Sequence, residues 1–207
     1  MDNSYKVEIL AQEVISRFWS TLTKLTLKYT RRDGRTETLV REVNDHGHAA
    51  AVLAYDPRRK TVLLVKQMRI AALVTGYTQA LIEVCAGMRD GDDARTCALR
   101  EAEEEIGVRL RDLRDVANVF MSPGALTERV SLFIGTYSPE DRNGDGGGNA
   151  AEGEDIEVIE LPLEQAYGMI ASGEIVDAKT IILLQHAMLA DITGGFGGGA
   201  TSTRDHN

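Results

Sequence analysis

The chain has little cysteine, no long apolar run and no excess of basic charge. Its two cysteines, Cys85 and Cys97, lie in apolar or helical surroundings and form no C-x-x-C pair, which excludes a disulfide framework and a zinc knuckle. No apolar run reaches about 18 residues, and the first residues lack a basic region followed by an apolar stretch. We therefore expect no membrane span, no secretory signal and a cytoplasmic location.

The charged residues are unbalanced toward acid. The 207 residues include 32 Asp and Glu against 23 Lys and Arg, a formal net charge of -9. This sign disfavours a nucleic-acid strand as the partner. Small anionic substrates remain possible where divalent cations stand between carboxylates and phosphates. The length fits one ordinary domain with a small appendage.

Hydrophobic patterns predict an amino-terminal hairpin followed by a core sheet. Alternating residues at 23–30 and 36–43 flank an Asp-Gly turn, as in a β-hairpin. The apolar runs 49–55 and 61–66 are typical of strands covered on both faces. We also expect strands at 81–85, 115–120 and 130–137, helices at 94–106, 163–172 and 178–190, and a loop at 139–155. Strands interleaved with helices predict an α/β or α+β sandwich.

These patterns divide the chain into three parts. Residues 1–45 form an amino-terminal β region, residues 46–193 form the main domain, and residues 194–207 form a Gly-rich tail that is expected to be disordered. The run GDGGGN at 144–149 lacks the Lys-Ser/Thr of a phosphate cradle. We predict that this run is a flexible loop.

Acidic residues cluster near the end of the expected helix 94–106, which Gly107 closes. At about 100° per residue, Glu101, Glu104 and Glu105 share one face, where like charges repel and the helix dipole disfavours anions. A run of Glu on a helix is usually a solvated face, but the Gly-rich turn directly before this helix favours a functional site. We therefore expect a divalent cation here, Mg²⁺ or Mn²⁺, which takes oxygen ligands and keeps several waters.

The segment from Gly87 to Val108 resembles the signature box of the Nudix hydrolases, G-x5-E-x7-R-E-U-x-E-E-x-G-U, in which U is a bulky aliphatic residue. Asp93 replaces the first Glu, only six residues separate it from Arg100, and Ala102 takes a U position. The GDP-mannose hydrolases, a branch close to the ADP-ribose pyrophosphatases, share this shortened loop. The likeness runs from about residue 5 to 190, through segments such as VREVNDHGHAA, VLLVKQMRIA, LIEVCAGMRD, FMSPGALTERV, GEDIEVIELP and SGEIVDAKTIILL.

The resemblance implies a fold and an activity. The fold would be a Nudix α/β/α sandwich with a mixed sheet, plus an amino-terminal antiparallel hairpin or small β domain used in dimerisation. The activity would be Mg²⁺-dependent hydrolysis of a nucleoside-diphosphate sugar, foremost GDP-mannose to GMP and mannose 1-phosphate. Two alternatives stay open: an ADP-ribose pyrophosphatase that forms AMP and ribose 5-phosphate, and a Nudix module that binds a nucleotide without turnover.

The resemblance also implies a metal site in the box. Glu101 and Glu105 match the family's metal ligands, and the backbone carbonyl of Ala86 matches a further ligand. Glu104 matches the middle acid of the box, which in the family binds metal directly or orients the arginine, here Arg100.

Other matching positions lie outside the metal ligands. The loop acid that completes the metal site or acts as general base would be Glu154, with Glu152 as its neighbouring rival. Glu128, in the turn SPGALTE, matches a substrate-contacting acid, although an ordinary surface turn residue is an alternative. The positions that match substrate contacts are Arg69, Gly87, Glu128 and Lys179.

The last match implies an exchanged arm between two subunits. Arg41 and Glu42 match residues that cross from the partner subunit to recognise the nucleotide. Residues 1–45 would then be a dimerisation arm, and a monomer would lack part of its site. Val40 departs from this pattern, because a lysine stands at that position in a member of this branch.

Overall fold

The computed structural model describes residues 6–192, which fall into two compact units. One unit comprises the described residues up to His48 together with Val119–Val130. The other comprises Ala49–Asn118 and the described residues from Ser131 onward. The Gly-rich tail expected from residue 194 lies outside the described residues. No helix in the range 6–192 is long and apolar enough to cross a membrane.

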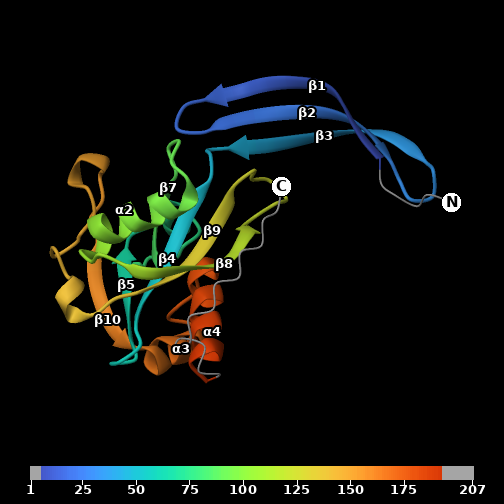
Figure 1. Ribbon diagram of the computed structural model, residues 1–207. Coiled ribbons are helices and arrows are strands. Elements are labelled where there is room, and N and C mark those ends of the chain that lie inside the picture. The colour runs from blue at the N-terminus through green and yellow to red at the C-terminus, as the bar shows by residue number, and fades with distance from the viewer. Residues whose placement is uncertain (1–5, 193–207) are drawn as a thin grey trace. The chain divides into compact units, whose positions relative to one another are not determined.

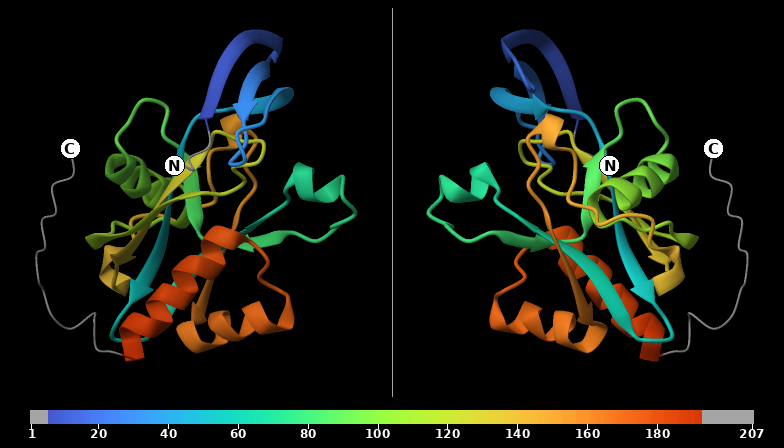
Figure 2. Two further views of the ribbon diagram at one scale, coloured as in Figure 1. Left: turned by 90° about the vertical axis from the view of Figure 1, so that its right-hand side faces the viewer. Right: turned by 90° about the vertical axis from the view of Figure 1, so that its left-hand side faces the viewer.

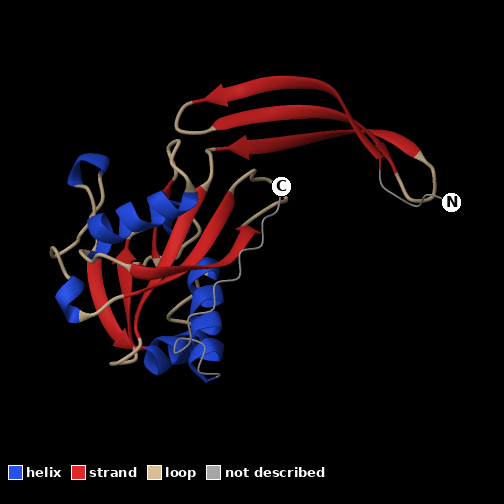
Figure 3. Ribbon diagram, in the orientation of Figure 1, coloured by secondary structure: helices blue, strands red, loops and turns tan. Residues whose placement is uncertain are grey.

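The first unit contains an antiparallel sheet of three strands, drawn in red in Figure 3. β2 (Thr21–Thr30) and β3 (Thr36–Asp45) form the expected hairpin. The unexpected strand is β1 (Lys6–Arg17), which pairs with β2 at the edge of the sheet. Its register shifts between Ile9 and Ala11 and again between Val14 and Ser16, and each shift interrupts the alternation by which a strand is recognised.

The second unit is built around a large sheet. Its strand order is β10-β5-β4-β9-β8, with β6 paired to β5 and β7 paired to β4. The strands are β4 (Ala49–Asp56), β5 (Thr61–Gln67), β6 (Leu81–Glu83), β7 (Cys85–Met88), β8 (Arg111–Phe120), β9 (Arg129–Thr136) and β10 (Glu157–Pro162). The helices are α1 (Ile70–Leu73), α2 (Ala94–Ile106), α3 (Leu163–Ser172) and α4 (Ala178–Ile192), with two short 3-10 helices, η1 (Pro139–Asp141) and η2 (Ala150–Glu152).

Helices cover both faces of this sheet. All eight residues of β4 are buried, as the apolar run 49–55 predicted for a strand between two layers. Ala98, Ala102 and Ile106 of α2 join a core cluster with alternate residues of β4 and β5. In Figures 1 and 2, α2 lies on one face of the sheet and α3 and α4 lie on the other. This mixed sheet between helical layers confirms the expected α/β/α sandwich.

Local residues fix both ends of α2. Asp93 caps the amino terminus, because its carboxylate accepts hydrogen bonds from the backbone of Arg95 at 2.9 Å and of Thr96 at 3.1 Å. Gly107 closes the helix in the left-handed conformation at φ 65°. Both bounds of the expected helix are confirmed.

Candidate functional site

Two of the three predicted helix carboxylates are buried. Glu101 and Glu105 expose 6% and 1% of their surface, whereas Glu104 is exposed. Burial raises the pKa of Glu101 to about 7, and the charges of Glu104 and Glu154 add to this rise while Arg100 opposes it. Burial also raises the pKa of Glu105 to about 7, and the charges of Glu101 and Glu154 contribute in the same direction. The pair is therefore a desolvated, mutually repelling set of oxygen donors.

Arg100 lies between two of these acids. Its Nη1 donates to Glu101 Oε1 at 2.8 Å and to Glu104 Oε2 at 3.2 Å. Its Nη2 donates to the backbone carbonyl of Met88 in β7 at 3.2 Å. Arg100 thus connects α2 to the adjacent strand. The contact with Glu104 fits the alternative in which the middle acid of the box orients this arginine.

The backbone of β7 packs directly against the buried pair. The backbone N–H of Ala86 donates to Glu105 Oε2 at 3.0 Å. At Gly87, an added Cβ would lie 2.0 Å from Glu101 Oε1. Only a glycine therefore leaves room for the Glu101 carboxylate in its present position.

This close approach predicts a large effect for Gly87→Ala. The new methyl group must displace the Glu101 carboxylate, so we expect a tenfold to hundredfold loss in kcat/KM and weaker Mn²⁺ binding, on the order of the losses seen when the support of a metal ligand is disturbed. Gly168→Ala in α3 is the matched control, because a Cβ there meets nothing within 4 Å. Steady-state kinetics and Mn²⁺ titration followed by electron paramagnetic resonance measure both variants. Equal activity of the two variants would contradict the close contact.

A glycine-rich loop is attached to the carboxyl end of α2. The backbone N–H groups of Gly147 and Gly148 donate to the carbonyls of Glu105 at 2.9 Å and Glu104 at 3.2 Å. Gly146 adopts φ 69°, and a Cβ there would lie 2.4 Å from the Glu105 carbonyl oxygen. The run predicted as a flexible loop therefore also satisfies the last carbonyls of the helix.

The same loop holds the candidate loop acids. The Glu154 carboxylate accepts a hydrogen bond from the backbone N–H of Asn149 at 2.7 Å. Its charge raises the pKa of both Glu101 and Glu105, so the loop brings this acid to the buried pair. The backbone of Glu152 lies in η2, and its side chain falls outside the described part of the structure.

The buried pair fits a divalent cation that keeps much of its water. Within residues 6–192, no three Asp, Glu, His or Cys side chains meet closely enough to enclose an ion. Mg²⁺ does not need such a cage, since it binds through one or two carboxylates, waters and substrate phosphates. Glu101 and Glu105 supply carboxylate oxygens beside the tight space at Gly87, and a cation would offset their repulsion.

The raised pKa values predict a joint effect of pH and Mg²⁺ on stability. Glu101 and Glu105 have folded pKa values of about 7 against ordinary values of 4.5, so the folded state binds more protons between these limits. The unfolding free energy of the metal-free protein should therefore fall by roughly 3 kcal/mol for each acid as the pH rises through this window. Mg²⁺ should raise Tm more at about pH 8 than at about pH 6, because it binds the deprotonated acids. Equal rises at the two pH values in thermal unfolding would contradict this.

Arg69 and Lys179, two predicted substrate contacts, meet at one buried carboxylate. Glu83 is 3% exposed; its Oε2 accepts from Arg69 Nε at 2.7 Å and its Oε1 accepts from Lys179 Nζ at 2.6 Å. Lys179 also donates to Asp177 at 2.8 Å. Burial lowers the pKa of Lys179, but Glu83 and Asp177 outweigh burial and raise it above its ordinary value. The sequence interpretation missed Glu83, whose only signal is an acid within the apolar run LIEVC.

The remaining candidates lie in the first unit. Arg41 and Glu42 are exposed on β3, and Arg41 Nη1 donates to the carbonyl of Val40 at 2.8 Å. Glu128 is half-buried and follows a turn that Asn44 holds through backbone hydrogen bonds of 2.8 Å to Ala125 and 3.1 Å to Thr127. The structure thus groups Glu128 with β3 in one unit and the box carboxylates in the other.

Comparison with known families decides the classification. A model of the NUDIX domain matches residues 45–184. The chain belongs to the Nudix family. A second model, described as the GDP-mannose pyrophosphatase NudK N-terminal domain, matches residues 6–43 of this Nudix protein. The two matches meet at the end of β3.

Curated relatives resemble this Nudix protein over nearly its whole length. It is 41% identical to a protein of Klebsiella pneumoniae named GDP-mannose pyrophosphatase, over 93% of this chain and 96% of the relative. Proteins of the same name from Shigella dysenteriae and Escherichia coli O157:H7 are each 40% identical over 90% of this chain and 97% of their own length.

A solved structure shares the Nudix fold. It is described as the crystal structure of ADP compounds hydrolase and matches with a TM-score of 0.67 over 93% of this chain and 96% of that chain. The sequence identity is 18%, so this likeness supports the fold class alone.

Proposed function

We propose that this Nudix protein is a pyrophosphatase that hydrolyses GDP-mannose to GMP and mannose 1-phosphate. The observation that carries the proposal is the pair of buried carboxylates, Glu101 and Glu105. They pack against β7, where Gly87 leaves room for the carboxylate of Glu101. The relatives named GDP-mannose pyrophosphatase, which match over at least 90% of this chain, support the choice of substrate.

In this proposal the box residues hold a divalent cation, Mg²⁺ with Mn²⁺ as a substitute. Glu101 and Glu105 bind it through carboxylate oxygens, and the Ala86 carbonyl is a further ligand. When bound, such a cation neutralises phosphate charge and lowers the pKa of its water. Arg100 holds Glu101 and Glu104 in place through the contacts described above.

The loop acid completes the chemistry. We assign Glu154 as the general base that removes the proton of the attacking water, with Glu152 as the alternative. Support for Glu154 comes from its position, since its carboxylate is held by the Asn149 N–H at 2.7 Å and its charge acts on both buried acids. A base must lie within hydrogen-bond reach of the proton that it removes.

The substrate contacts divide into phosphate and nucleotide contacts. Arg69 and Lys179 would contact the phosphates, because a guanidinium and an ammonium both pair with phosphate oxygens. Gly87 lets the backbone approach the ligand, and Glu128 would accept hydrogen bonds from its hydroxyl or amino groups.

We further propose a homodimer with exchanged amino-terminal arms. Every residue of β1 is exposed, including Val7, Ile9 and Val14, and an exposed apolar edge strand is a ready surface for a second chain. Arg41 and Glu42 of the partner subunit would then recognise the nucleotide.

A substrate screen tests the proposed function. Purified protein with Mg²⁺ is assayed against GDP-mannose, ADP-ribose, other sugar nucleotides and dinucleoside polyphosphates, with products separated by chromatography. GDP-mannose should give the highest kcat/KM, and the products should be GMP and mannose 1-phosphate. A clear preference for ADP-ribose would overturn the substrate assignment. Tight nucleotide binding without turnover would instead identify a binding module.

A further inference from the structure

We propose that Glu83 is a positioning residue that aims Arg69 at the phosphates of the substrate. This inference rests on the proposed function. The sequence alone assigns no role to Glu83. The inference comes from the geometry of this one buried carboxylate. It pairs with two basic side chains from distant parts of the chain, Arg69 and Lys179, which lie 14 and 96 residues away in the sequence.

Each carboxylate oxygen of Glu83 accepts a hydrogen bond from one basic side chain. Oε2 accepts from Arg69 Nε at 2.7 Å, and Oε1 accepts from Lys179 Nζ at 2.6 Å. The carboxylate is therefore fully engaged and has little freedom to rotate. Burial of an ionised acid is tolerated where it is paired in this way.

Arg69 is the more exposed of the two basic side chains in this cluster. Its side chain is 42% exposed, whereas the Lys179 side chain is 13% exposed. In the part of the chain that the structure describes, Glu83 is the one ion-pair partner of Arg69. Because this pairing uses Nε, the terminal Nη1 and Nη2 groups remain to bind two phosphate oxygens. A guanidinium fixed by Nε also loses less rotamer entropy when a ligand binds.

Lys179 and its neighbours anchor Glu83 from the other side. Lys179 also binds Asp177 Oδ1 at 2.8 Å, and Asp177 Oδ2 caps α4 by accepting from the Thr180 N–H at 3.0 Å. The Thr180 hydroxyl in turn accepts from the backbone N–H of Val84 at 2.8 Å. Glu83 at the end of β6 and Val84 after it are therefore fixed to the first turn of α4 by two separate contacts.

β6 ends at Glu83, and after Val84 the chain enters β7, which contacts the proposed metal ligands. Ala86, three residues after Glu83, donates its N–H to Glu105 at 3.0 Å. One extended segment thus holds Arg69 through a side chain and Glu105 through the backbone. The distance between a phosphate-binding arginine and the metal-binding carboxylates is set within four consecutive residues.

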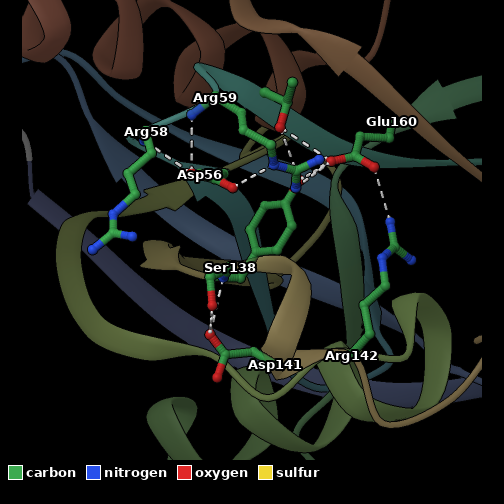
Figure 4. A network of polar contacts seen from close by, with 9 residues as sticks. Asp56, Arg58, Arg59, Ser138, Asp141, Arg142 and Glu160 are labelled. Carbon is green, nitrogen blue, oxygen red and sulfur yellow. Dashed lines mark hydrogen bonds and ion pairs between the residues drawn. The ribbon is translucent and has the colours of Figure 1, made fainter.

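The protein contains a matched example of the same chemistry outside the proposed site. Glu160 binds two arginines, Arg59 at 2.6 Å and Arg142 at 3.1 Å, and accepts from the Tyr137 hydroxyl at 2.7 Å (Figure 4). None of these residues is among the proposed substrate or metal contacts. Glu160→Gln therefore reports what the loss of a bridging carboxylate does to stability alone.

The test compares Glu83→Gln with Glu160→Gln in the full-length protein. For Glu83→Gln we expect KM for GDP-mannose to rise tenfold to hundredfold, as for other supporting contacts of a site, with Mn²⁺ affinity of the nucleotide-free protein unchanged. For Glu160→Gln we expect a lower Tm and an unchanged KM. The effect of Arg69→Ala combined with Glu83→Gln should be smaller than the sum of the two single effects, because Glu83 acts in part through Arg69.

Three results would overturn the positioning role. They are an unchanged KM in folded Glu83→Gln, the same rise in KM in Glu160→Gln, or additive effects in the double variant. If Glu83→Gln does not fold, Glu83→Asp decides, since it keeps the charge and should still raise KM by shortening the reach to Arg69. If the wild type proves inactive, the proposed function fails, and calorimetry with GDP and Mg²⁺ on the same variants still tests the role of Glu83.

Discussion

Glu105→Gln should lower Mg²⁺-dependent turnover by at least about a hundredfold, because loss of a metal ligand should exceed the tenfold to hundredfold cost of losing a supporting contact. The amide keeps the size of the side chain but removes the charge that holds the cation. The backbone N–H of Ala86 retains an acceptor, the amide oxygen, at the position where Oε2 now accepts at 3.0 Å. Steady-state assays over a Mg²⁺ titration measure the loss.

Folding should survive this substitution. Burial raises the pKa of Glu105 to about 7, so the charged form destabilises the metal-free protein at alkaline pH, and a neutral amide removes that cost. Tm without metal at about pH 8 should therefore be equal to or above that of the wild type. Glu103→Gln is the matched control on the same helix, because Glu103 contacts Asn143 at 3.1 Å and Arg109 at 3.6 Å outside the proposed site. Undiminished turnover of Glu105→Gln would end the metal assignment.

Deletion of residues 1–43 should produce a monomer and raise KM for GDP-mannose by at least about tenfold, as expected when ligand contacts worth about 1.4 kcal/mol are lost. The deletion removes the exposed edge strand β1 together with Arg41 and Glu42. It ends before Asn44, so that the Asn44 N–H still donates to the Ala125 carbonyl and the Asn44 carbonyl still accepts from the Thr127 N–H. Light scattering after size-exclusion chromatography gives the oligomeric state, and initial rates give KM.

A second variant separates assembly from recognition. Arg41→Ala combined with Glu42→Ala leaves the apolar residues of β1 in place, so it should remain a dimer and still lose nucleotide affinity. A fully active monomer from the deletion would refute the arm hypothesis. A dimeric double variant with wild-type KM would refute the recognition role of Arg41 and Glu42 alone.

Local signals made α2 and its carboxylates predictable from the sequence. Asp93 and Gly107 mark the two ends of the helix within one segment of chain, and the spacing of Glu101 and Glu105 fixes their common face. The burial of both acids could not be read from that spacing. It depends on the backbone of β7, which approaches so closely at Gly87 that a Cβ would lie 2.0 Å from Glu101.

Contacts between residues far apart in the sequence, and irregularities within a strand, could not be predicted from local sequence patterns. The pairing of Glu83 with Lys179 joins residues 96 positions apart, and no periodicity encodes such a contact. The strand β1 was missed because its two register shifts move apolar residues from one face to the other. The glycines at 146–148 signalled a loop, but their hydrogen bonds to Glu104 and Glu105 depend on the folded position of the helix end.

The attachment of the glycine loop to α2 has a consequence for engineering. Gly146 cannot take a side chain without displacing the Glu105 carbonyl, which its Cβ would approach to 2.4 Å, so this stretch has a fixed length and composition. At Gly153 a Cβ would meet nothing within 4 Å, but this glycine adopts φ 80° and lies between Glu152 and Glu154, the two candidate loop acids. New peptide segments intended to alter the substrate range should therefore leave residues 146–154 intact, because an insertion there would move either the end of the helix or a loop acid.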